Sequence, residues 1–207
     1  MRREPERTVP PPASLIYELS SYVERIDVAQ VFQKAQPLQL ELGSGDGSFL
    51  AQWAVLNPAF NFLGVERLLG RLRKLERKGQ RVGLTNLRAL RIEASYLLNY
   101  LLPARAVHSL HVYFPDPWPK RKHRKNRLVN ESFPTSAARV LASGGAVYLR
   151  TDDADYFAQM RAVFGANAQF HPVETPEDLR ATRTDFERGF QARGVPTLRA
   201  AYQLADV

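Results

Sequence analysis

Two periods of hydrophobic spacing alternate along this chain. Apolar residues at every second position, as at Leu38, Leu40 and Leu42, are typical of a β-strand, whereas a spacing of three or four is typical of a helix. On this basis the sequence predicts strands at 38–42, 61–65, 86–92, 107–114, 146–150 and 197–203. It predicts helices at 14–33, 49–56, 68–78, 96–102, 128–141 and 156–164.

Strands that alternate with helices of this length predict an α/β fold, in which a parallel sheet is covered by helices on both faces. Right-handed crossovers then bring the loops that follow the strands to one edge, where such sheets bind ligands. Pro134 should break or kink the helix at 128–141. We expect a single domain at 14–207 with a helical extension at 14–36, preceded by a flexible, proline-rich tail at 1–13.

The composition narrows the class of protein. The 207 residues include no cysteine, which excludes disulfides and thiolate-bound zinc, and no cluster of metal ligands stands out. No apolar run is long enough to span a membrane and no signal peptide is recognisable, so we expect a cytoplasmic protein with no metal and no membrane partner. The formal net charge of +8 favours nucleic acid as a partner, because no lipid-anchor motif is present.

The turn after the first of these strands contains three glycines, at Gly43, Gly45 and Gly47. Glycine lets the backbone pass close beneath a ligand. The dinucleotide-binding fingerprint is the main alternative, but it requires glycine at the position of Ser48 and places a pyrophosphate against the helix that follows. Glu41 and Asp46 surround the turn with negative charge, which suits the ammonium and sulfonium groups of S-adenosylmethionine better than a pyrophosphate.

Further acidic residues follow the next two strands. A carboxylate at Glu66 can accept hydrogen bonds from both ribose hydroxyls of an adenosine. Glu93 is expected near the adenine amino group, with Arg67 and Ala94 beside the ring. Any one of these acids would serve equally well as a solvated residue or a helix cap. Their common register with the glycine turn favours a nucleoside site.

The strand at 107–114 ends in a stiff turn, in which two prolines flank Asp116 and hold its carboxylate at low entropic cost. A rigid turn with one local hydrogen bond is the simpler interpretation. Six cations and no acid follow the turn: Lys120, Arg121, Lys122, Arg124, Lys125 and Arg127. Such a run usually faces solvent, but beside the ligand edge it favours contacts with phosphates.

The predicted helix at 68–78 carries a second group of cations: Arg71, Arg73, Lys74, Arg77 and Lys78. Only Glu76 opposes them within the helix, while Leu68, Leu72 and Leu75 form the stripe expected to be buried. The outer face of this helix extends the candidate surface for a polyanion, although the same charges would also serve solubility alone.

Four motifs stand out when the chain is considered as a whole. They are Gly-Ser-Gly-Asp-Gly at 43–47, Phe-Pro-Asp-Pro-Trp-Pro-Lys at 114–120, Leu-Arg-Thr-Asp-Asp at 149–153 and Thr-Asp-Phe-Glu-Arg at 184–188. Together they resemble the bacterial tRNA (guanine-N7-)-methyltransferases, over roughly 38–202. The resemblance implies a Rossmann-like class I methyltransferase fold, with a mostly parallel seven-stranded sheet and helices on both faces.

The resemblance also implies an activity: transfer of a methyl group from S-adenosylmethionine to N7 of the guanine at tRNA position 46, with S-adenosylhomocysteine as the product and no metal. By resemblance, the cofactor contacts are Glu41, Glu66, Glu93 and Asp116, next to Gly43, Arg67 and Ala94 from the turns described above. Asp116 is also the implied catalytic position. The implied contacts with the tRNA substrate are Lys120, Asp152, Thr184, Asp185, Phe186 and Glu187.

Guanine N7 carries a lone pair and no proton, so its methylation needs no general base. We therefore interpret Asp116 as a group that positions the reactants and stabilises developing positive charge. Asp152 is a candidate for the same role. It would alternatively cap the helix at 156–164, for which Asp153 and Asp155 are also suitable.

Thr184 and Glu187 have the spacing of a capping box, a role compatible with contact to RNA. Rival interpretations of the whole chain are a methyltransferase of an exocyclic amine and a non-catalytic RNA-binding module with a nucleoside pocket. Ser48 and the acidic turn argue against a nicotinamide oxidoreductase. The sequence leaves open whether the protein is a monomer or a homodimer.

Overall fold

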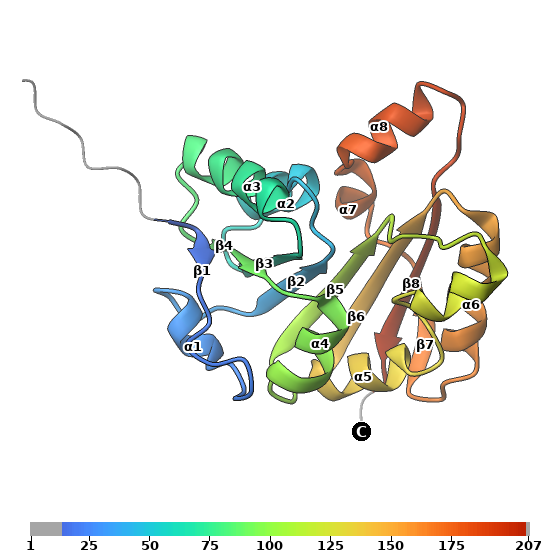
Figure 1. Cartoon of the computed structure of the whole chain (residues 1–207), viewed down its shortest axis with the longest axis horizontal. Coiled ribbons are helices and arrows are strands. Elements are labelled where there is room, and N and C mark those ends of the chain that lie inside the picture. Colours follow the sequence, from blue (N-terminus) through green and yellow to red (C-terminus); the bar gives the residue numbers. More distant parts are fainter. Residues whose placement is uncertain (1–13, 206–207) are drawn as a thin grey trace, which may run out of the picture.

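The computed structural model describes residues 14–205, so the tail expected at 1–13 lies outside the described residues. Its centre is one eight-stranded sheet in the order β1-β4-β3-β2-β5-β6-β8-β7 (Figure 1). The strands are β1 (Ile16–Tyr17), β2 (Leu38–Leu42), β3 (Asn61–Glu66), β4 (Leu87–Arg91), β5 (Val107–Tyr113), β6 (Leu141–Thr151), β7 (Phe170–Val173) and β8 (Leu198–Leu204). Adjacent strands are parallel except where β8 pairs with β6 and β7. The mostly parallel sheet is therefore confirmed, and the two-residue β1 adds an eighth strand to the expected seven.

Helices cover both faces of the sheet, as the alternating pattern predicts (Figure 1). The α-helices are α1 (Val28–Val31), α2 (Ser48–Leu56), α3 (Leu69–Arg81), α4 (Ala94–Tyr96), α5 (Phe133–Val140), α6 (Ala154–Gly165), α7 (Glu177–Ala181) and α8 (Asp185–Gln191). A π-helix, η1 (Leu97–Leu101), continues α4, and a 3₁₀-helix, η2 (Arg121–Asn126), follows β5. Apolar side chains of α2, α3 and α7 join one core cluster, and those of η1, α5 and α6 join the other.

The alternation in β2 divides its side chains between these two clusters. Leu38, Leu40 and Leu42 pack with η1, α5 and α6. Gln39 and Glu41 point to the opposite face and are nevertheless buried, at 5% and 3% exposure. Buried polar groups need partners, because an unpaired one costs about 1–3 kcal/mol. Gln39 has such partners, since its Oε1 lies 2.9 Å from Trp53 Nε1.

The prediction of a helix at 14–33 is wrong, and so is the prediction that the extension at 14–36 is helical. The chain there is mostly irregular, with a strand of two residues and a helix of four. The amide of Ala89 donates to Leu15 O at 2.8 Å, so this segment pairs with the open edge of β4. Edge strands leave backbone groups unpaired, and satisfying them outweighs a weak local preference for helix.

Two further helices differ from expectation in where they begin or how they wind. The helix at 128–141 is neither broken nor kinked by Pro134, because α5 begins only at Phe133. Proline fits the first turn of a helix, where no intrahelical partner exists for its missing N–H. The helix expected at 96–102 is present as the end of α4 followed by the π-helical turn η1.

The order of the strands determines where a ligand can bind. The chain builds one side of the sheet from β2 to β4 and then returns to place β5 and β6 on the other side of β2. Loops after β2 and β5 therefore leave in opposite directions, which opens a crevice at the carboxyl edge of the sheet.

Candidate active site

A cavity of about 320 Å³ occupies this crevice. It is lined by residues at or after the carboxyl ends of four strands: Leu42 and Gly43 at β2; Val65, Glu66, Arg67, Leu68 and Arg71 at β3; Ile92, Glu93 and Ala94 after β4; and Phe114, Pro115, Asp116, Trp118, Asn126 and Leu128 after β5. The structure thus brings together six of the seven residues expected to contact the cofactor. The seventh, Glu41, lies in β2, two positions before Gly43, and is not part of the cavity lining.

Two glycines of the turn face open space, and the third is packed tightly against α3. Gly43 and Gly45 have φ angles of +82° and +55°, and a Cβ on either would meet no atom within 4 Å. Gly47, with φ +73°, has no such freedom, because a Cβ there would lie 2.5 Å from Leu75 Cγ on α3. The turn therefore needs glycine for its conformation throughout, and at Gly47 also for contact with α3.

Glu41 and Ser44 are buried beside this turn with unpaired oxygen atoms. Within residues 14–205, Glu41 Oε2 and Ser44 Oγ have no hydrogen-bond partner. Burial raises the pKa of Glu41 well above its usual range, and the Arg150 guanidinium only partly opposes this effect. A cationic ligand at the turn would meet an acceptor that the protein itself leaves unsatisfied.

Glu66 and Glu93 differ in how far the protein already uses their carboxylates. Glu66 is buried, accepts a hydrogen bond from Leu68 N at 2.9 Å and lies 3.6 Å from the Arg71 guanidinium. Glu93 is exposed and caps α4, with its oxygens 3.0 Å from Ser95 N and 2.7 Å from Tyr96 N. The capping role that we considered for these acids is therefore real at Glu93, on the wall of the same cavity.

The turn that carries Asp116 is strained on both sides. Phe114 and Trp118 adopt φ angles of +50° and +44°, which are uncommon outside glycine. The structure holds this conformation through the Phe114 amide, which donates to Arg150 O at 2.8 Å, and through Pro117 O, which accepts from Arg127 Nε at 2.7 Å. The Asp116 side chain is exposed to the cavity and makes no hydrogen bond or ion pair within residues 14–205.

The basic loop, residues 120–127, is only partly a free cationic surface. Arg127 is 2% exposed, and its guanidinium lies 2.6 Å from Asp155 Oδ2 on α6. Arg124 also contacts Asp155, at 3.0 Å. The expectation that six cations face a polyanion is therefore wrong for Arg127, which fastens the loop to the domain. The exposed members without an ion pair in the described chain are Lys120, Arg121, Lys122 and Lys125.

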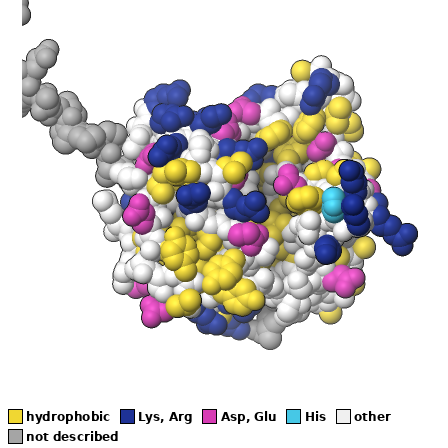
Figure 2. Space-filling model, viewed as in Figure 1, with side chains coloured by type: hydrophobic (Ala, Val, Ile, Leu, Met, Phe, Trp, Pro, Cys, Tyr) yellow, Lys and Arg dark blue, Asp and Glu magenta, His cyan; other side chains and the backbone are white. Residues whose placement is uncertain are grey.

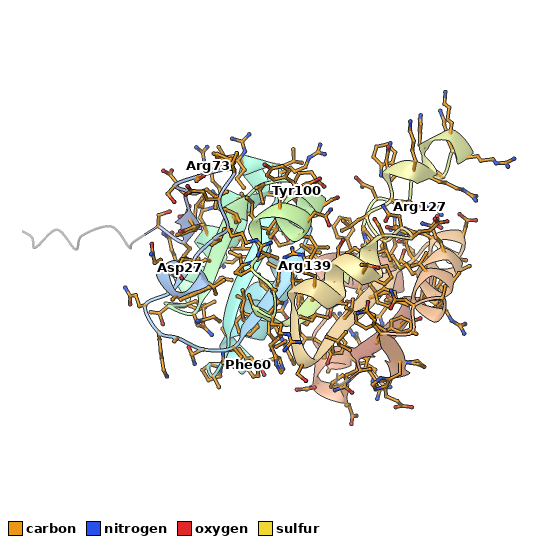
Figure 3. All side chains as sticks on the ribbon, turned by 90° about the horizontal axis from the view of Figure 1, so that it is seen from below. Asp27, Phe60, Arg73, Tyr100, Arg127 and Arg139 are labelled. Atoms are coloured by element: carbon orange, nitrogen blue, oxygen red, sulfur yellow. The ribbon has the colours of Figure 1, made fainter. Side chains whose placement is uncertain are left out.

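The figures show how these cations are presented. Lys and Arg side chains project from the right-hand edge of the molecule, where the basic loop lies (Figure 2). In Figure 3, Arg127 lies beneath η2, whose own side chains point away from the domain. Arg73 of α3 also points outward in this view. On the same helix, Arg71 instead contacts Glu66, and Lys78 contacts Asp46. The cations of α3, like those of the basic loop, are therefore partly exposed and partly used in ion pairs within the domain.

The expected capping box of α8 is confirmed. Thr184 Oγ1 accepts from Glu187 N at 3.0 Å, and Glu187 Oε2 accepts from Thr184 N at 3.0 Å. Both side chains are buried, and Glu187 is 0% exposed. Asp185 and Phe186 are exposed at the start of the helix, and the Phe186 ring lies 6.2 Å from that of Phe114 in the cavity wall.

Lys120 and Asp152 lie outside the cavity lining. Asp152 follows β6 and is exposed. It does not cap α6, because the cap is Asp153, whose Oδ1 accepts from Tyr156 N at 2.7 Å. The helix cap that we considered as an alternative role for Asp152 is therefore provided by Asp153.

Sequence reasoning missed a buried arginine that joins the site to the carboxyl-terminal part of the chain. Arg150 is 1% exposed and stacks over the Tyr113 ring at 4.1 Å. Its guanidinium contacts Glu187 Oε2 at 2.7 Å and Thr182 O at 2.9 Å. Arg199 contacts the other oxygen of Glu187 at 2.7 Å. Only the fact that Arg150 belongs to a recognised motif could have directed attention to it.

Two features are absent from the described chain. Among residues 14–205, no helix is both long and apolar enough to cross a membrane. The same residues contain no group of three or more histidine, cysteine or acidic side chains arranged to hold a metal ion.

The fold and the position of the cavity define the class of protein. The structure is similar to the 16S rRNA methyltransferase KamB, with a TM-score of 0.60 and 16% identity over 85% of this chain and 91% of that one. The fold is that of the class I methyltransferases.

Sequence comparison identifies the family. Residues 35–200 match the family model Methyltransf_4, described as "Putative methyltransferase". The chain is 34% identical to the tRNA (guanine-N(7)-)-methyltransferase of Halorhodospira halophila, over 88% of this chain and 78% of that protein. It is 36% identical to the enzyme of the same name from Chromobacterium violaceum, over 83% and 76%. The chain belongs to this family of methyltransferases.

Proposed function

We propose that this protein is a tRNA (guanine-N7-)-methyltransferase, which transfers a methyl group from S-adenosylmethionine to N7 of guanine 46. The observation that carries the proposal is that Asp116, whose carboxylate makes no hydrogen bond or ion pair within residues 14–205, lines the same cavity as Gly43, Glu66 and Glu93. The exposed cations of the basic loop follow directly after it. The names of the relatives support the same activity. In this proposal tRNA is the partner and the cytoplasm the location.

The residues at the crevice fit S-adenosylmethionine. The unpaired, buried oxygens of Glu41 and Ser44 suit an ammonium group, and Gly43 leaves open space beside them. Glu66 would accept hydrogen bonds from the ribose hydroxyls, and Glu93 would lie near the adenine, with Arg67 and Ala94 on the same wall. When bound, the cofactor supplies an electrophilic methyl group on a sulfonium centre.

The catalytic part of the proposal concerns Asp116. No residue has to remove a proton from guanine N7, because none is there. The purine ring gains positive charge as the new bond forms, and a fixed carboxylate nearby stabilises that charge. The same carboxylate can accept hydrogen bonds from donors on the guanine, which orients N7. The flanking prolines and the contacts that hold Phe114 and Pro117 keep the group in place before the substrate arrives.

The proposed RNA contacts surround this centre. Lys120 and the exposed cations after it would bind phosphates, and Asp152 would contact the substrate from the end of β6. Asp185 and Phe186 are accessible at the start of α8. Thr184 and Glu187 are buried, so we assign them to holding this segment in position rather than to touching the RNA with their side chains.

The test is to incubate the protein with labelled S-adenosylmethionine and unmodified tRNA, and then to cleave the RNA chemically at N7-methylguanosine. We expect one cleavage site, at guanine 46. Asp116→Asn should lower turnover by about 100-fold or more, as expected when a group that stabilises transition-state charge is lost. Its tRNA affinity should change by less than about tenfold, because the basic loop is intact.

Glu131→Gln is the matched control, since this exposed carboxylate lies outside the cavity lining. It should retain near-normal turnover. Label found on an exocyclic amine would support the rival methyltransferase, and binding of both ligands without any transfer would support the non-catalytic RNA-binding module. Near-normal turnover of Asp116→Asn would refute the role of Asp116.

A further inference from the structure

Lys78 joins two parts of the protein to which the proposed function assigns different ligands. Its Nζ lies 2.8 Å from Asp46 Oδ2, in the glycine turn of the cofactor site. The same Nζ lies 3.5 Å from Asp185 Oδ2, at the start of α8. Asp46 and Asp185 are 139 positions apart in sequence (185 − 46), so one ammonium group connects two distant segments of the chain, the glycine turn and the start of α8.

Packing fixes the helix that carries Lys78. Leu75, one turn earlier in α3, is fully buried, and it lies against both Gly47 and Gly64 so closely that neither has room for a Cβ. Leu72 is also completely buried on this face. The position of Lys78 relative to the glycine turn is therefore set by the core and not by its own charge.

Neighbouring hydrogen bonds join the same two parts independently of Lys78. The amide of Asp185 donates to Ser48 Oγ at 3.0 Å, and Gln52 Nε2 donates to Arg183 O at 3.3 Å. Ser48 in turn is linked to the turn, because its amide donates to Asp46 Oδ1 at 3.1 Å. Asp46, the first turn of α2 and the start of α8 thus form one connected junction.

The electrostatics make Lys78 the central member of this junction. Without its ammonium group, Asp185 would keep its ion pair with Arg188, but no cation would bridge the carboxylates of Asp46 and Asp185. Its side chain is 30% exposed, and it is not among the residues that line the proposed cofactor cavity. It therefore has no evident contact with the cofactor, and its role is to hold the two segments together.

We propose that Lys78 and Ser48 are positioning residues that couple the glycine turn to the tRNA-contacting segment at 184–187, so that each ligand favours binding of the other. This inference rests on the proposed function. A cofactor that orders the turn fixes Asp46 and Ser48, which in turn fix the start of α8. Coupling of this kind is reciprocal, because the free-energy difference is the same whichever ligand binds first.

The experiment measures the affinity for S-adenosylhomocysteine, which carries no methyl group to transfer, with and without saturating tRNA. In the wild-type protein tRNA should tighten this binding by about fivefold or more, within the usual range for coupled sites. In Lys78→Met the ratio of the two affinities should fall to near one. Lys78→Arg should restore at least half of the missing effect, because it restores the charge between the two carboxylates.

Lys34→Met is the matched control, because Lys34 is exposed, lies outside the proposed RNA-binding surface and makes no ion pair in the described chain. It removes the same charge and should leave the ratio unchanged. A mere loss of stability would weaken both affinities without changing their ratio. Should Lys78→Met fail to fold, Ser48→Ala removes the acceptor for the Asp185 amide and the side-chain hydrogen bond to Asp46, and it should lower the same ratio.

A wild-type ratio of one, or a ratio that persists in Lys78→Met, would overturn this inference. The outcome is separate from that of the proposed function. A protein that methylates tRNA but binds its two ligands independently retains the proposed function and loses only the coupling. A protein that transfers no methyl group to tRNA loses the proposed function itself.

Discussion

At the scale of single residues, Glu41 is a carboxyl group in surroundings that oppose its charge. It is buried with one oxygen unpaired in the described chain, and burial is the main reason that its pKa is raised. A carboxyl group whose pKa is raised on folding stabilises the fold fully only below its pKa in the unfolded chain. That contribution is lost as the pH rises through the folded-state pKa. The ionised form of Glu41 therefore opposes folding, increasingly as the pH rises, unless a cation compensates its charge.

We therefore expect Glu41→Gln to stabilise the ligand-free protein above neutral pH and to weaken its binding of the cofactor. At pH 8 the variant should melt about 2–4 °C above the wild type, as expected for roughly 1 kcal/mol in a chain of this size. The difference should disappear towards pH 4, where Glu41 is neutral. Affinity for S-adenosylhomocysteine should fall by about tenfold or more. Thermal unfolding across pH and ligand titration test the two effects.

Gln39→Glu is the opposite control, since it places a second carboxyl group on the same buried face of β2 and should destabilise the protein at pH 8. A Glu41→Gln variant that melts below the wild type at pH 8 would contradict the account of Glu41. Unchanged cofactor affinity would remove Glu41 from the proposed site.

The sequence predicts a site residue when the role of that residue depends on its neighbours along the chain. Glu41, Glu66 and Asp116 were predicted as site residues because strand ends of a parallel sheet meet at one edge, to which the glycine turn and the motif at 114–120 also belong. Ser44 and Arg150 were not predicted. Ser44 owes its role to burial, and Arg150 owes its role to partners from distant segments; membership of a motif reveals neither role.

At the scale of elements, the cations of the basic loop have two roles. One of them attaches the loop to the domain, and the others are available to bind RNA. Arg127 is attached to α6 through Asp155, so the remaining cations are displayed on a fixed base. Neutralising Lys120, Arg121 and Lys122 to glutamine should therefore weaken tRNA binding without unfolding the loop. The dependence of log Kd on log salt should become shallower by nearly one unit for each phosphate that the loop no longer binds. Titrations with tRNA at several KCl concentrations measure this slope.

Arg105→Gln is the control for this prediction. Arg105 is an exposed cation that precedes β5, whereas the basic loop follows that strand, so the two lie at opposite edges of the sheet. The control should leave the salt dependence unchanged. An unaltered slope in the triple variant would mean that the loop faces solvent in the complex.

Elements were predicted well where their pattern is long and regular, and poorly where they depend on distant partners. The strands from β2 to β5 and the helices α2 and α3 follow from their periods, whereas β6 begins at Leu141, five positions before the expected start. The chain before 34 was wrongly predicted as helical, because its apolar spacing is also satisfied by pairing with β4. Strand β7 was not predicted, since it is short, contains Pro172 and forms by pairing with β8 from the end of the chain.

At the scale of the whole molecule, α8 is held against the sheet through one fully buried carboxylate. Glu187 on α8 contacts Arg150 on β6 and Arg199 on β8, each at 2.7 Å. Arg150 also donates to backbone oxygens that precede α8, including Thr182 O at 2.9 Å. Loss of one partner of a buried ion pair leaves the other charge uncompensated, which typically costs about 3–5 kcal/mol.

Glu187→Gln should therefore lower the free energy of unfolding by about 3–5 kcal/mol, measured by urea denaturation at neutral pH. In the fraction that remains folded, the start of α8 loses its anchor, so KM for tRNA should rise at least fivefold while KM for S-adenosylmethionine changes less than twofold. Glu177→Gln, at an exposed position on α7, should leave both quantities unchanged. Equal increases in the two KM values would mean that Glu187 supports the fold as a whole and has no particular role in holding the segment that meets RNA.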